Sequence, residues 1–515
     1  MAKMHWADVI VKKIIGEKGD KKKYTVAAGI TPSGTVHIGN FREIITVDLV
    51  ARALRDAGKE VRFIYSWDDY DVFRKVPKNM PKQDMLKKNL RKPIVDIEDP
   101  FGKEKSYARH FEVEVENDVA KVGVNPEYLF QANKYRNLEY VKGIKTALEN
   151  ADKIRELLNE HRQVPLAEDW LPLTGFCPEC GTDKITFSDY SKNNVKMKCE
   201  CGFEENVDIA KANFLKLPWR IDWPMRWAFE KVDFEPGGKD HSTTGGSFDT
   251  GKGIVEIYDW TAPSYLMYNF ISIKGGAGKI SSSSGDVVTV GDCLEVYEPE
   301  IVRWLFAGTR PGAEFAISFD LDVLKIYEDF DKCERIFFGE QKAKDEEHQK
   351  RIYELSMVKN PPKKLPYQPS FRHLTNNLQI NDLDIEKTVE FYQNELRDDD
   401  DREKLRKRAV CAKNWIGKYA PEEFKFSINE TVSKVDVKFK ALIEDVVKQL
   451  VKRDWTDKEL HEEFYVLMKK YDIDNKDFFG LMYGVLIGKE KGPQLASFVL
   501  TIGRERVAAL LKGAI

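Results

Sequence analysis

The segment from residue 23 to residue 65 constrains the fold of this chain more than any other. A β-prone run, Tyr24-Thr25-Val26, precedes a loop over 29–36 that is rich in small and turn-forming residues. A helix is predicted to begin near His37, because apolar residues recur at helical spacing at Ile38, Phe41, Ile44, Ile45 and Leu49. Gly58 suits its end, and 61–65 is again β-prone. Strand, helix and strand at this distance predict a βαβ unit, and hence an α/β, doubly wound parallel (Rossmann-like) sheet.

A phosphate site is predicted at the loop with the sequence GITPSGTVHIGN, residues 29–40. Small residues such as Gly34 and Gly39 let a ligand approach the backbone, and the N-terminus of the next helix favours negative charge. His37 and Asn40 lie three residues apart on the first turn, so both side chains can face the ligand. The alternative is an ordinary helix cap with a surface histidine.

Two further segments favour nucleotide chemistry. Asp240 in the sequence GGKDH, residues 237–241, follows glycines at a predicted strand end, where it can accept a hydrogen bond from a ribose hydroxyl. The glycine-rich loop after residue 274 carries Lys279, Ser281 and Ser282, which can close over a phosphate. The alternatives are a plain turn and a flexible linker.

The three segments, in this order, resemble the HIGH and KMSKS motifs of the class I aminoacyl-tRNA synthetases. Together with WRIDWPMRW (219–227) and YNFISIKGGAGKISSSSG (268–285), they are similar to the class I lysyl-tRNA synthetases over about residues 20–330. Asn40 stands where HIGH has its second histidine, and Ser282 stands where KMSKS has its second lysine.

This resemblance implies that ATP, with Mg²⁺, activates L-lysine, which is then transferred to lysine tRNA. It implies catalytic roles for His37, Asn40 and Lys279. It also implies a lysine pocket formed by Gly29, Thr31, Trp219, His241 and Tyr268. A glutamyl-type enzyme, a nucleotidyltransferase of the same superfamily and a zinc-ribbon RNA-binding protein remain alternatives. Asp68, Asp69 and Asp71 could bind the substrate amine or merely solvate a loop.

A structural zinc site is predicted from four cysteines. Cys177 and Cys180 are followed, after 18 intervening residues, by Cys199 and Cys201. Paired thiolates at this spacing are typical of a tetrahedral Cys₄ site with no open position. A weaker metal cluster, whose alternative is an exposed acidic loop, comprises Asp96, Asp99 and His110.

Charge and hydropathy narrow the class of protein further. The net charge of the 515 residues is −3, so no nucleic-acid partner follows from global charge. Locally, residues 73–92 hold eight Lys or Arg and one acid, which suits either RNA phosphates or a solvated face. No apolar stretch reaches the length of about 18 residues that suggests a membrane helix, and no signal peptide is evident. We therefore expect a cytoplasmic protein without a membrane partner, and a monomer.

Five domain segments are expected. Residues 1–90 and 214–274 form the two halves of the catalytic domain, and the second half is expected to hold short strands such as GIVEIYDW (253–260). Residues 91–213 form an inserted domain with the zinc site and with helices over 106–122 and 138–158. Residues 275–330 hold the lysine loop and a stem. Residues 331–515 form an all-α half, which the resemblance assigns to the anticodon.

Overall fold

The computed structural model describes residues 4–274 and 287–515. It comprises two compact units. Unit 1 consists of Met1–Leu294, Pro299–Ile317 and Cys333–Pro361, and unit 2 consists of Glu295–Glu298, Ser318–Lys332 and Pro362–Ile515. Within the described ranges, no helix has both the length and the apolar character needed to cross a membrane.

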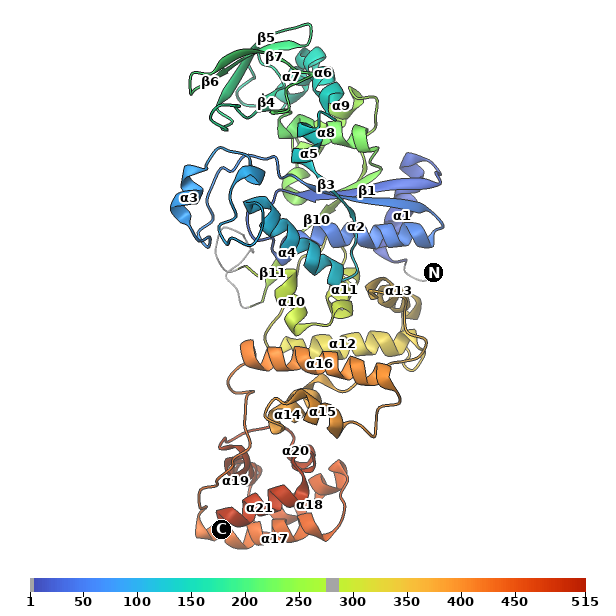
Figure 1. The fold of residues 1–515 in the computed structure, drawn as a ribbon. Coiled ribbons are helices and arrows are strands. Elements are labelled where there is room, and N and C mark those ends of the chain that lie inside the picture. Colours follow the sequence, from blue (N-terminus) through green and yellow to red (C-terminus); the bar gives the residue numbers. More distant parts are fainter. Residues whose placement is uncertain (1–3, 275–286) are drawn as a thin grey trace. The chain divides into compact units, whose positions relative to one another are not determined.

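A five-stranded, fully parallel sheet forms the centre of unit 1 (Figure 1). Its order is β10-β9-β1-β2-β3, and its strands are β1 (Lys23–Ile30), β2 (Glu60–Trp67), β3 (Glu127–Phe130), β9 (Phe234–Gly238) and β10 (Ser264–Tyr268). Helix α2 (Ile38–Asp56) packs along β1, β2 and β9. On the sheet, Ala27, Ile64 and Leu129 pack against the tryptophans of α8 (Trp219–Glu230). The βαβ unit and the doubly wound parallel sheet are therefore confirmed.

The remaining elements of the catalytic part surround this sheet. The helices are α1 (Trp6–Lys18), α3 (Gln83–Lys88), α4 (Tyr107–Lys121), α5 (Gln131–Arg136), α9 (Ser247–Glu256), α11 (Pro299–Ala307) and α13 (Glu346–Ser356), with 3-10 turns η1 (Ile94–Asp96) and η2 (Lys239–His241). Strands β11 (Ile271–Ile273) and β12 (Phe315–Ile317) pair in parallel. Helices α10 (Val290–Val296) and α12 (Asp322–Phe337) each contribute residues to both units.

The inserted region is built around an antiparallel sheet of β5 (Ile185–Ser191), β6 (Asn194–Cys199) and β7 (Glu204–Asp208). The pair β4 (Thr174–Gly175) and β8 (Leu215–Lys216) and the helices α6 (Val141–Glu149) and α7 (Ala151–Asn159) complete it. Its core also includes Ile221 and Met225 of α8 and Ile254 of α9. The insertion therefore shares one core with the catalytic segment that follows it.

Three sequence expectations differ from the structure. Residues 127–130, placed in the insertion, form the edge strand of the central sheet. The helix expected over 138–158 is two helices, because Asn150 ends one and begins the next. GIVEIYDW is no strand: its first half ends α9, where Ile254 and Val255 are buried. Its β-branched residues favoured a strand locally, but packing of α9 on α8 decides the outcome.

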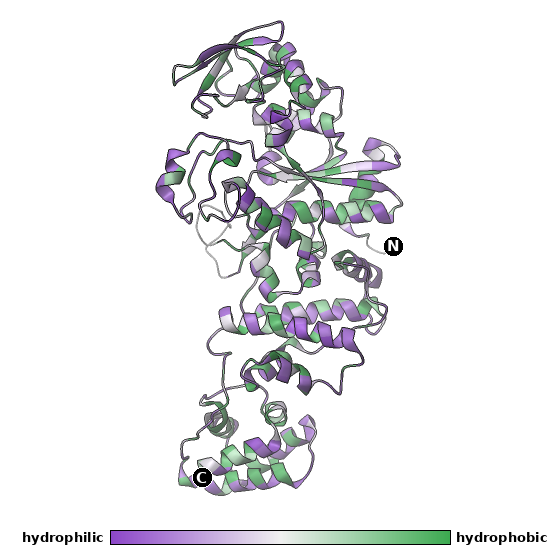
Figure 2. Cartoon of the chain, in the orientation of Figure 1, coloured by the Kyte–Doolittle hydropathy of each residue, from purple (hydrophilic) through white to green (hydrophobic). Residues whose placement is uncertain are grey.

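Unit 2 is entirely helical in its described secondary structure, as expected for the C-terminal half. Its helices after the shared α12 are α14 (Phe371–Ile380), α15 (Ile385–Phe391), α16 (Asp399–Lys418), α17 (Lys440–Lys452), α18 (Asp457–Lys470), α19 (Asn475–Ile487), α20 (Leu495–Ile502) and α21 (Arg504–Ala514), with the 3-10 turn η3 (Val437–Phe439). Figure 2 shows hydrophobic and hydrophilic residues mixed on each of these helices. The apolar faces of α17 to α21 meet in one core. The domain boundary expected at 330/331 falls inside α12.

Candidate active site and metal centre

One cavity of about 1010 Å³, here called the main cavity, lies where the central strands end. Gly29 of β1, Gly238 of β9 and Tyr268 of β10 all line it, as does Asp68 directly after β2. This is the edge at which open parallel sheets bind ligands. All ten described residues predicted to bind ATP or lysine line it: Gly29, Thr31, Gly34, His37, Gly39, Asn40, Trp219, Asp240, His241 and Tyr268. Both motif segments that the structure describes, 29–40 and 237–241, therefore contribute to the lining of this cavity.

The start of α2 forms one side of the main cavity. His37 is the N-cap residue, in an extended conformation, and Asn40 lies in the first turn. A Cβ on Gly39 would lie 2.8 Å from the His37 ring, so glycine here makes room for the imidazole itself. Two N-terminal amides are already engaged: Ile38 N–H donates to the Val288 carbonyl and Asn40 N–H to the His37 carbonyl, each at 2.8 Å. The helix end thus offers fewer amides to a phosphate than its sequence suggested.

The turn after β9 places Asp240 at the opposite side. The strand ends in Gly237 and Gly238, and η2 follows with an exposed Asp240. A Cβ on Gly237 would collide with the Tyr265 hydroxyl at 2.0 Å, which explains glycine at this strand end. Asp240 is therefore presented to the cavity as expected. Lys279, Ser281 and Ser282 lie outside the described residues.

The five residues predicted to bind lysine all line the main cavity. The Tyr268 hydroxyl donates to Glu43 at 2.5 Å, and burial lowers the pKa of His241 from its ordinary value. The Arg226 guanidinium lies 5.6 Å from the centre of the Trp219 ring. The Trp219 ring is therefore already within cation–π distance of a protein cation.

Sequence reasoning missed two carboxylates at the site. Glu43 of α2 lines both the main cavity and a second, smaller cavity of about 70 Å³, and Glu235 of β9 lines the smaller cavity. Burial raises the pKa of each to about 7. A signal did exist, because Glu43 follows His37 and Asn40 at spacings of three on one helix face.

The three aspartates left open by the sequence are held by protein groups. Asp68 pairs with Arg226 at 2.6 Å, and Asp71 pairs with Lys216 at 2.7 Å while accepting from the Thr31 hydroxyl. Asp69 accepts from the Ala132 amide at 2.7 Å. Burial opposes ionisation of Asp71, but Lys216 outweighs it and lowers the Asp71 pKa. Asp68 and Asp71 are thus ion-paired groups that line the main cavity, and Asp69 is a buried hydrogen-bonded group; none of the three is a fully exposed loop carboxylate.

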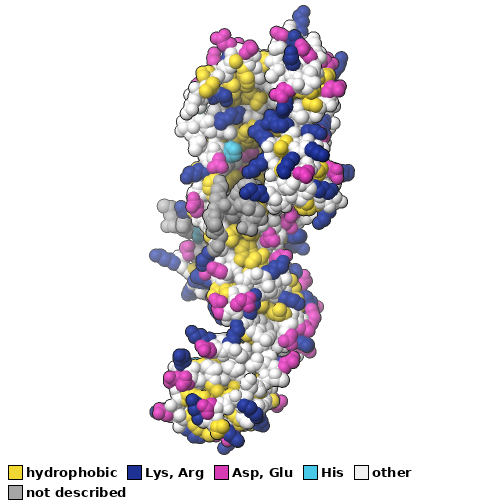
Figure 3. Space-filling view, turned by 90° about the vertical axis from the view of Figure 1, so that its left-hand side faces the viewer, with side chains coloured by type: hydrophobic (Ala, Val, Ile, Leu, Met, Phe, Trp, Pro, Cys, Tyr) yellow, Lys and Arg dark blue, Asp and Glu magenta, His cyan; other side chains and the backbone are white. Residues whose placement is uncertain are grey.

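The basic stretch 73–92 borders the same cavity. Phe73, Arg74, Lys75 and Pro77 line the main cavity, while Lys78, Lys82, Lys87 and Lys88 are exposed on α3 and its flanking loop. Lys and Arg side chains gather on the face of unit 1 shown in Figure 3. This arrangement can hold a polyanion next to the site.

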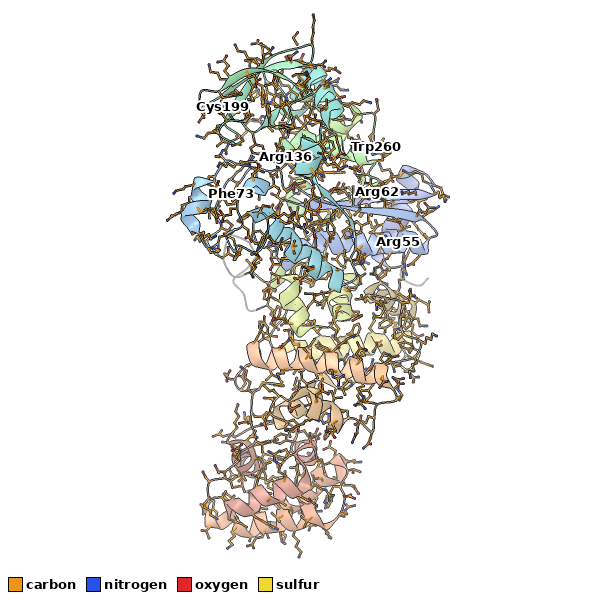
Figure 4. The ribbon with its side chains drawn as sticks, in the orientation of Figure 1. Arg55, Arg62, Phe73, Arg136, Cys199 and Trp260 are labelled. Carbon is orange, nitrogen blue, oxygen red and sulfur yellow. The ribbon has the colours of Figure 1, made fainter. Side chains whose placement is uncertain are left out.

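The four predicted zinc ligands converge in the insertion, where Figure 4 labels Cys199. Their sulfur atoms all lie within 4.8 Å of one another, with Cys177 Sγ 3.7 Å from Cys201 Sγ and Cys180 Sγ 3.6 Å from Cys199 Sγ. Four thiols at these separations fit one tetrahedral ion.

The second predicted metal cluster does not converge in this way. Asp96 forms a bidentate pair with Arg136, and Asp99 accepts backbone N–H groups of 101, 103 and 104. His110 Nδ1 lies 3.3 Å from Asp99. In the part of the chain that the structure describes, only the cysteines form a group that could hold a metal ion.

Comparison with known proteins agrees with this geometry. Residues 4–359 match the family model "tRNA synthetases class I (K)", and residues 418–515 match the model "Anticodon binding domain". The first match covers more than half of the chain, so the chain belongs to the class I aminoacyl-tRNA synthetases.

Curated relatives extend over the whole length. A protein named lysine--tRNA ligase from Borreliella burgdorferi is 50% identical over 514 residues, 98% of each chain. The protein of the same name from Treponema pallidum is 48% identical, over 99% of this chain and 98% of that one. The one from Thermococcus kodakarensis is 43% identical, over 99% of each chain.

Proposed function

We propose that this chain activates L-lysine with ATP and transfers the lysyl group to lysine tRNA. The observation that carries the proposal is that ten residues predicted to bind ATP or lysine line one cavity at the carboxyl edge of a parallel sheet, although they come from four places in the sequence: 29–40, 219, 240–241 and 268. The names of the full-length relatives support lysine as the amino acid.

In the first step, a lysine carboxylate oxygen attacks the α-phosphorus of ATP, and the bond to the β-phosphate oxygen breaks, releasing pyrophosphate. His37 and Asn40 stabilise charge on the phosphate oxygens from the start of α2, and Lys279 supplies a cation. Asp240 holds the ribose. Mg²⁺ bound with ATP would neutralise further phosphate charge.

In the second step, a terminal ribose hydroxyl of the tRNA attacks the acyl carbon. The ester bond forms, AMP leaves, and the hydroxyl proton passes to the departing phosphate. The protein contributes mostly position and fixed charge, which is the usual source of rate in such reactions.

ATP–pyrophosphate exchange against all twenty amino acids, with and without tRNA, tests this function. We expect exchange with lysine alone, and a decrease of about 10²–10³-fold in kcat for His37→Ala with lysine affinity unchanged. Exchange with glutamate alone would contradict the proposal and favour a glutamyl-type enzyme.

We also propose that the exposed lysines of residues 78–88 contact tRNA phosphates, while the C-terminal helices hold the anticodon. Lys87→Ala and Lys88→Ala together should weaken tRNA binding. The plot of log binding constant against log salt concentration should become shallower, its slope falling in magnitude by about one to two. Lysine and ATP affinities serve as the control and should not change. An unaltered salt slope would remove these lysines from the RNA surface.

The four cysteines are proposed to bind one structural zinc ion per chain. Elemental analysis should find one equivalent in the wild-type protein and less in Cys199→Ser. Because zinc binding is coupled to local folding, removal by a chelator should increase hydrogen exchange in β5 to β7. A native protein without zinc would contradict the assignment.

A further inference from the structure

Positive charge that is not already matched by the protein is scarce around the main cavity. Three Lys or Arg residues among those described line it, namely Arg74, Lys75 and Lys216. Lys216 is committed to the protein, because its ammonium lies 2.7 Å from a carboxylate oxygen of Asp71. In the described ranges, neither Arg74 nor Lys75 forms a salt bridge, and both side chains belong to exposed residues. They are therefore the cations of this lining that a ligand can use.

The start of α2 leaves a need for such cations. Phosphate groups are bound by cations and N–H donors, but the Ile38 and Asn40 amides each donate to a carbonyl of the protein at 2.8 Å. The Asn40 side chain is an uncharged amide. Ser282 also brings a hydroxyl to a motif position that holds a lysine in the resembling enzymes. The phosphates of ATP thus require positive charge from outside the start of α2.

The loop that follows β2 lies against the glycine-containing loop that precedes α2. The Tyr107 hydroxyl of α4 donates to the Ser33 carbonyl at 3.0 Å. The Tyr107 ring also packs on Phe73, which Figure 4 labels, with 5.0 Å between the ring centres. A Cβ on Gly34 would lie 3.4 Å from Pro77 Cγ. Direct packing and a shared tyrosine therefore hold the two loops together.

Arg74 and Lys75 lie between the two anchors of this loop. Phe73 on one side and Pro77 on the other are both buried, whereas the two cations between them are exposed and line the main cavity. A guanidinium can donate two parallel N–H groups to a phosphate, and an ammonium adds a compact charge. Because the backbone is held at both ends, less freedom is lost when the side chains bind an anion.

We propose that Arg74 and Lys75 bind the β- and γ-phosphates of ATP and the pyrophosphate that leaves. When the bond from the α-phosphorus to the bridging oxygen breaks, its electron pair passes to pyrophosphate. The two cations stabilise the negative charge that this leaving group gains. This inference rests on the proposed function and adds to it the groups that hold the leaving group.

Phosphates at the 3′ end of tRNA are the other anions that can reach this loop. The position of the loop favours ATP. It packs on Ser33 and Gly34, and that segment leads within a few residues to His37, where the proposed function places the α-phosphate. The outer phosphates of the same ATP molecule must lie close to the α-phosphate, whereas the tRNA phosphates need not.

The test measures dissociation constants of ATP, pyrophosphate and AMP, with Mg²⁺ present and tRNA absent. In the double variant Arg74→Gln with Lys75→Gln, we expect ATP and pyrophosphate to bind about 10–100-fold more weakly. AMP lacks the two outer phosphates and should change by no more than about twofold. Arg74→Lys keeps the charge and should weaken ATP less than Arg74→Gln does.

The matched control is the double variant Lys103→Gln with Lys105→Gln. It removes the same amount of charge from exposed residues of unit 1 that do not line the main cavity. All three dissociation constants should stay as in wild type. Circular dichroism checks that each variant is folded.

Three results would overturn the inference. The first is an ATP-to-AMP affinity ratio that does not change in the folded Arg74 and Lys75 double variant. The second is an equal loss of ATP affinity in the control, which would show that only overall charge matters. The third is unchanged ATP and pyrophosphate binding together with weaker binding of lysine tRNA that disappears when its 3′-terminal nucleotides are removed. That result would assign the two cations to the RNA.

The same measurements separate this inference from the proposed function. If wild type binds ATP but does not exchange pyrophosphate with lysine, the function is wrong, whatever the variants show. If wild type exchanges with lysine and the double variant keeps its ATP-to-AMP ratio, the function stands and only the role of Arg74 and Lys75 is wrong.

Discussion

The buried carboxylates of unit 2 and those at the main cavity differ in what neutralises them. In unit 2, the fully buried Arg408 pairs with Glu298 at 2.6 Å and with Asp331 at 2.8 Å, and its guanidinium lies 5.1 Å from the centre of the Tyr327 ring. Glu43, at the main cavity, and Glu235, at the smaller cavity beside Glu43, are held by neutral donors. The first arrangement serves the fold, because its charges are matched internally. The second leaves negative charge where a ligand can match it.

The largest effect that this comparison predicts is on Arg408. Arg408→Met would leave Glu298 and Asp331 buried without their cation, and should lower the free energy of unfolding by about 3–5 kcal/mol. Denaturant unfolding followed by circular dichroism measures this loss. The triple variant with Glu298→Gln and Asp331→Asn is the control, and should recover part of the stability. A loss below about 1 kcal/mol would mean that the ion pairs of Arg408 with Glu298 and Asp331 do not stabilise the fold.

Lys216 forms an ion pair with Asp71 at the main cavity itself. Lys216→Met should cost about 2–4 kcal/mol of stability, less than Arg408→Met because Asp71 is partly exposed and keeps its hydrogen bond from Thr31. Lysine binding should not become stronger, since Asp71 is not expected to hold the ammonium. Tighter lysine binding would identify Asp71 as the carboxylate that binds the ammonium, and would show that a protein cation beside a carboxylate does not exclude this role.

Glu43→Gln should increase the free energy of unfolding, whereas the two variants above decrease it. Burial raises the pKa of Glu43 to about 7 from an ordinary value of 4.5, so the folded protein holds its proton more tightly than the unfolded chain. Wild type therefore loses stability as pH rises from about 4.5 to 7. Glu43→Gln avoids this loss, and its advantage should grow over that window to about 1–3 kcal/mol and then level off.

Unfolding of both proteins at a series of pH values measures this advantage. Asp69, Glu112 and Glu235, whose pKa values are also raised to about 7, are present in both and cancel in the difference. A variant that is less stable than wild type at every pH would show that the charge of Glu43 is compensated within the protein.

Local pattern was enough to predict the parts of the site that are continuous in sequence. The βαβ unit, the glycine-flanked motif segments and the cysteine pairs each depend on a few neighbouring residues. The spacing of Glu43 from His37 and Asn40 could have placed it on the site's helix face, but the sequence could not show that Glu43 and Glu235 lack a cation, because the fold decides which groups lie beside them. The strand β3 was missed for a related reason: its four residues gain their role from pairing with β2.

Proton release on lysine binding tests the central claim most directly. Titration calorimetry at pH about 6.5, in two buffers with different ionisation enthalpies, counts the protons exchanged. The titratable groups around Glu43 are Tyr268, Glu235, Asp68, Arg226 and His241. We expect wild type to release roughly half to one proton as Glu43 ionises against the ammonium, Glu235→Gln to do the same, and Glu43→Gln to release almost none. Equal release by wild type and Glu43→Gln would contradict the claim that this carboxylate is left unbalanced for the substrate.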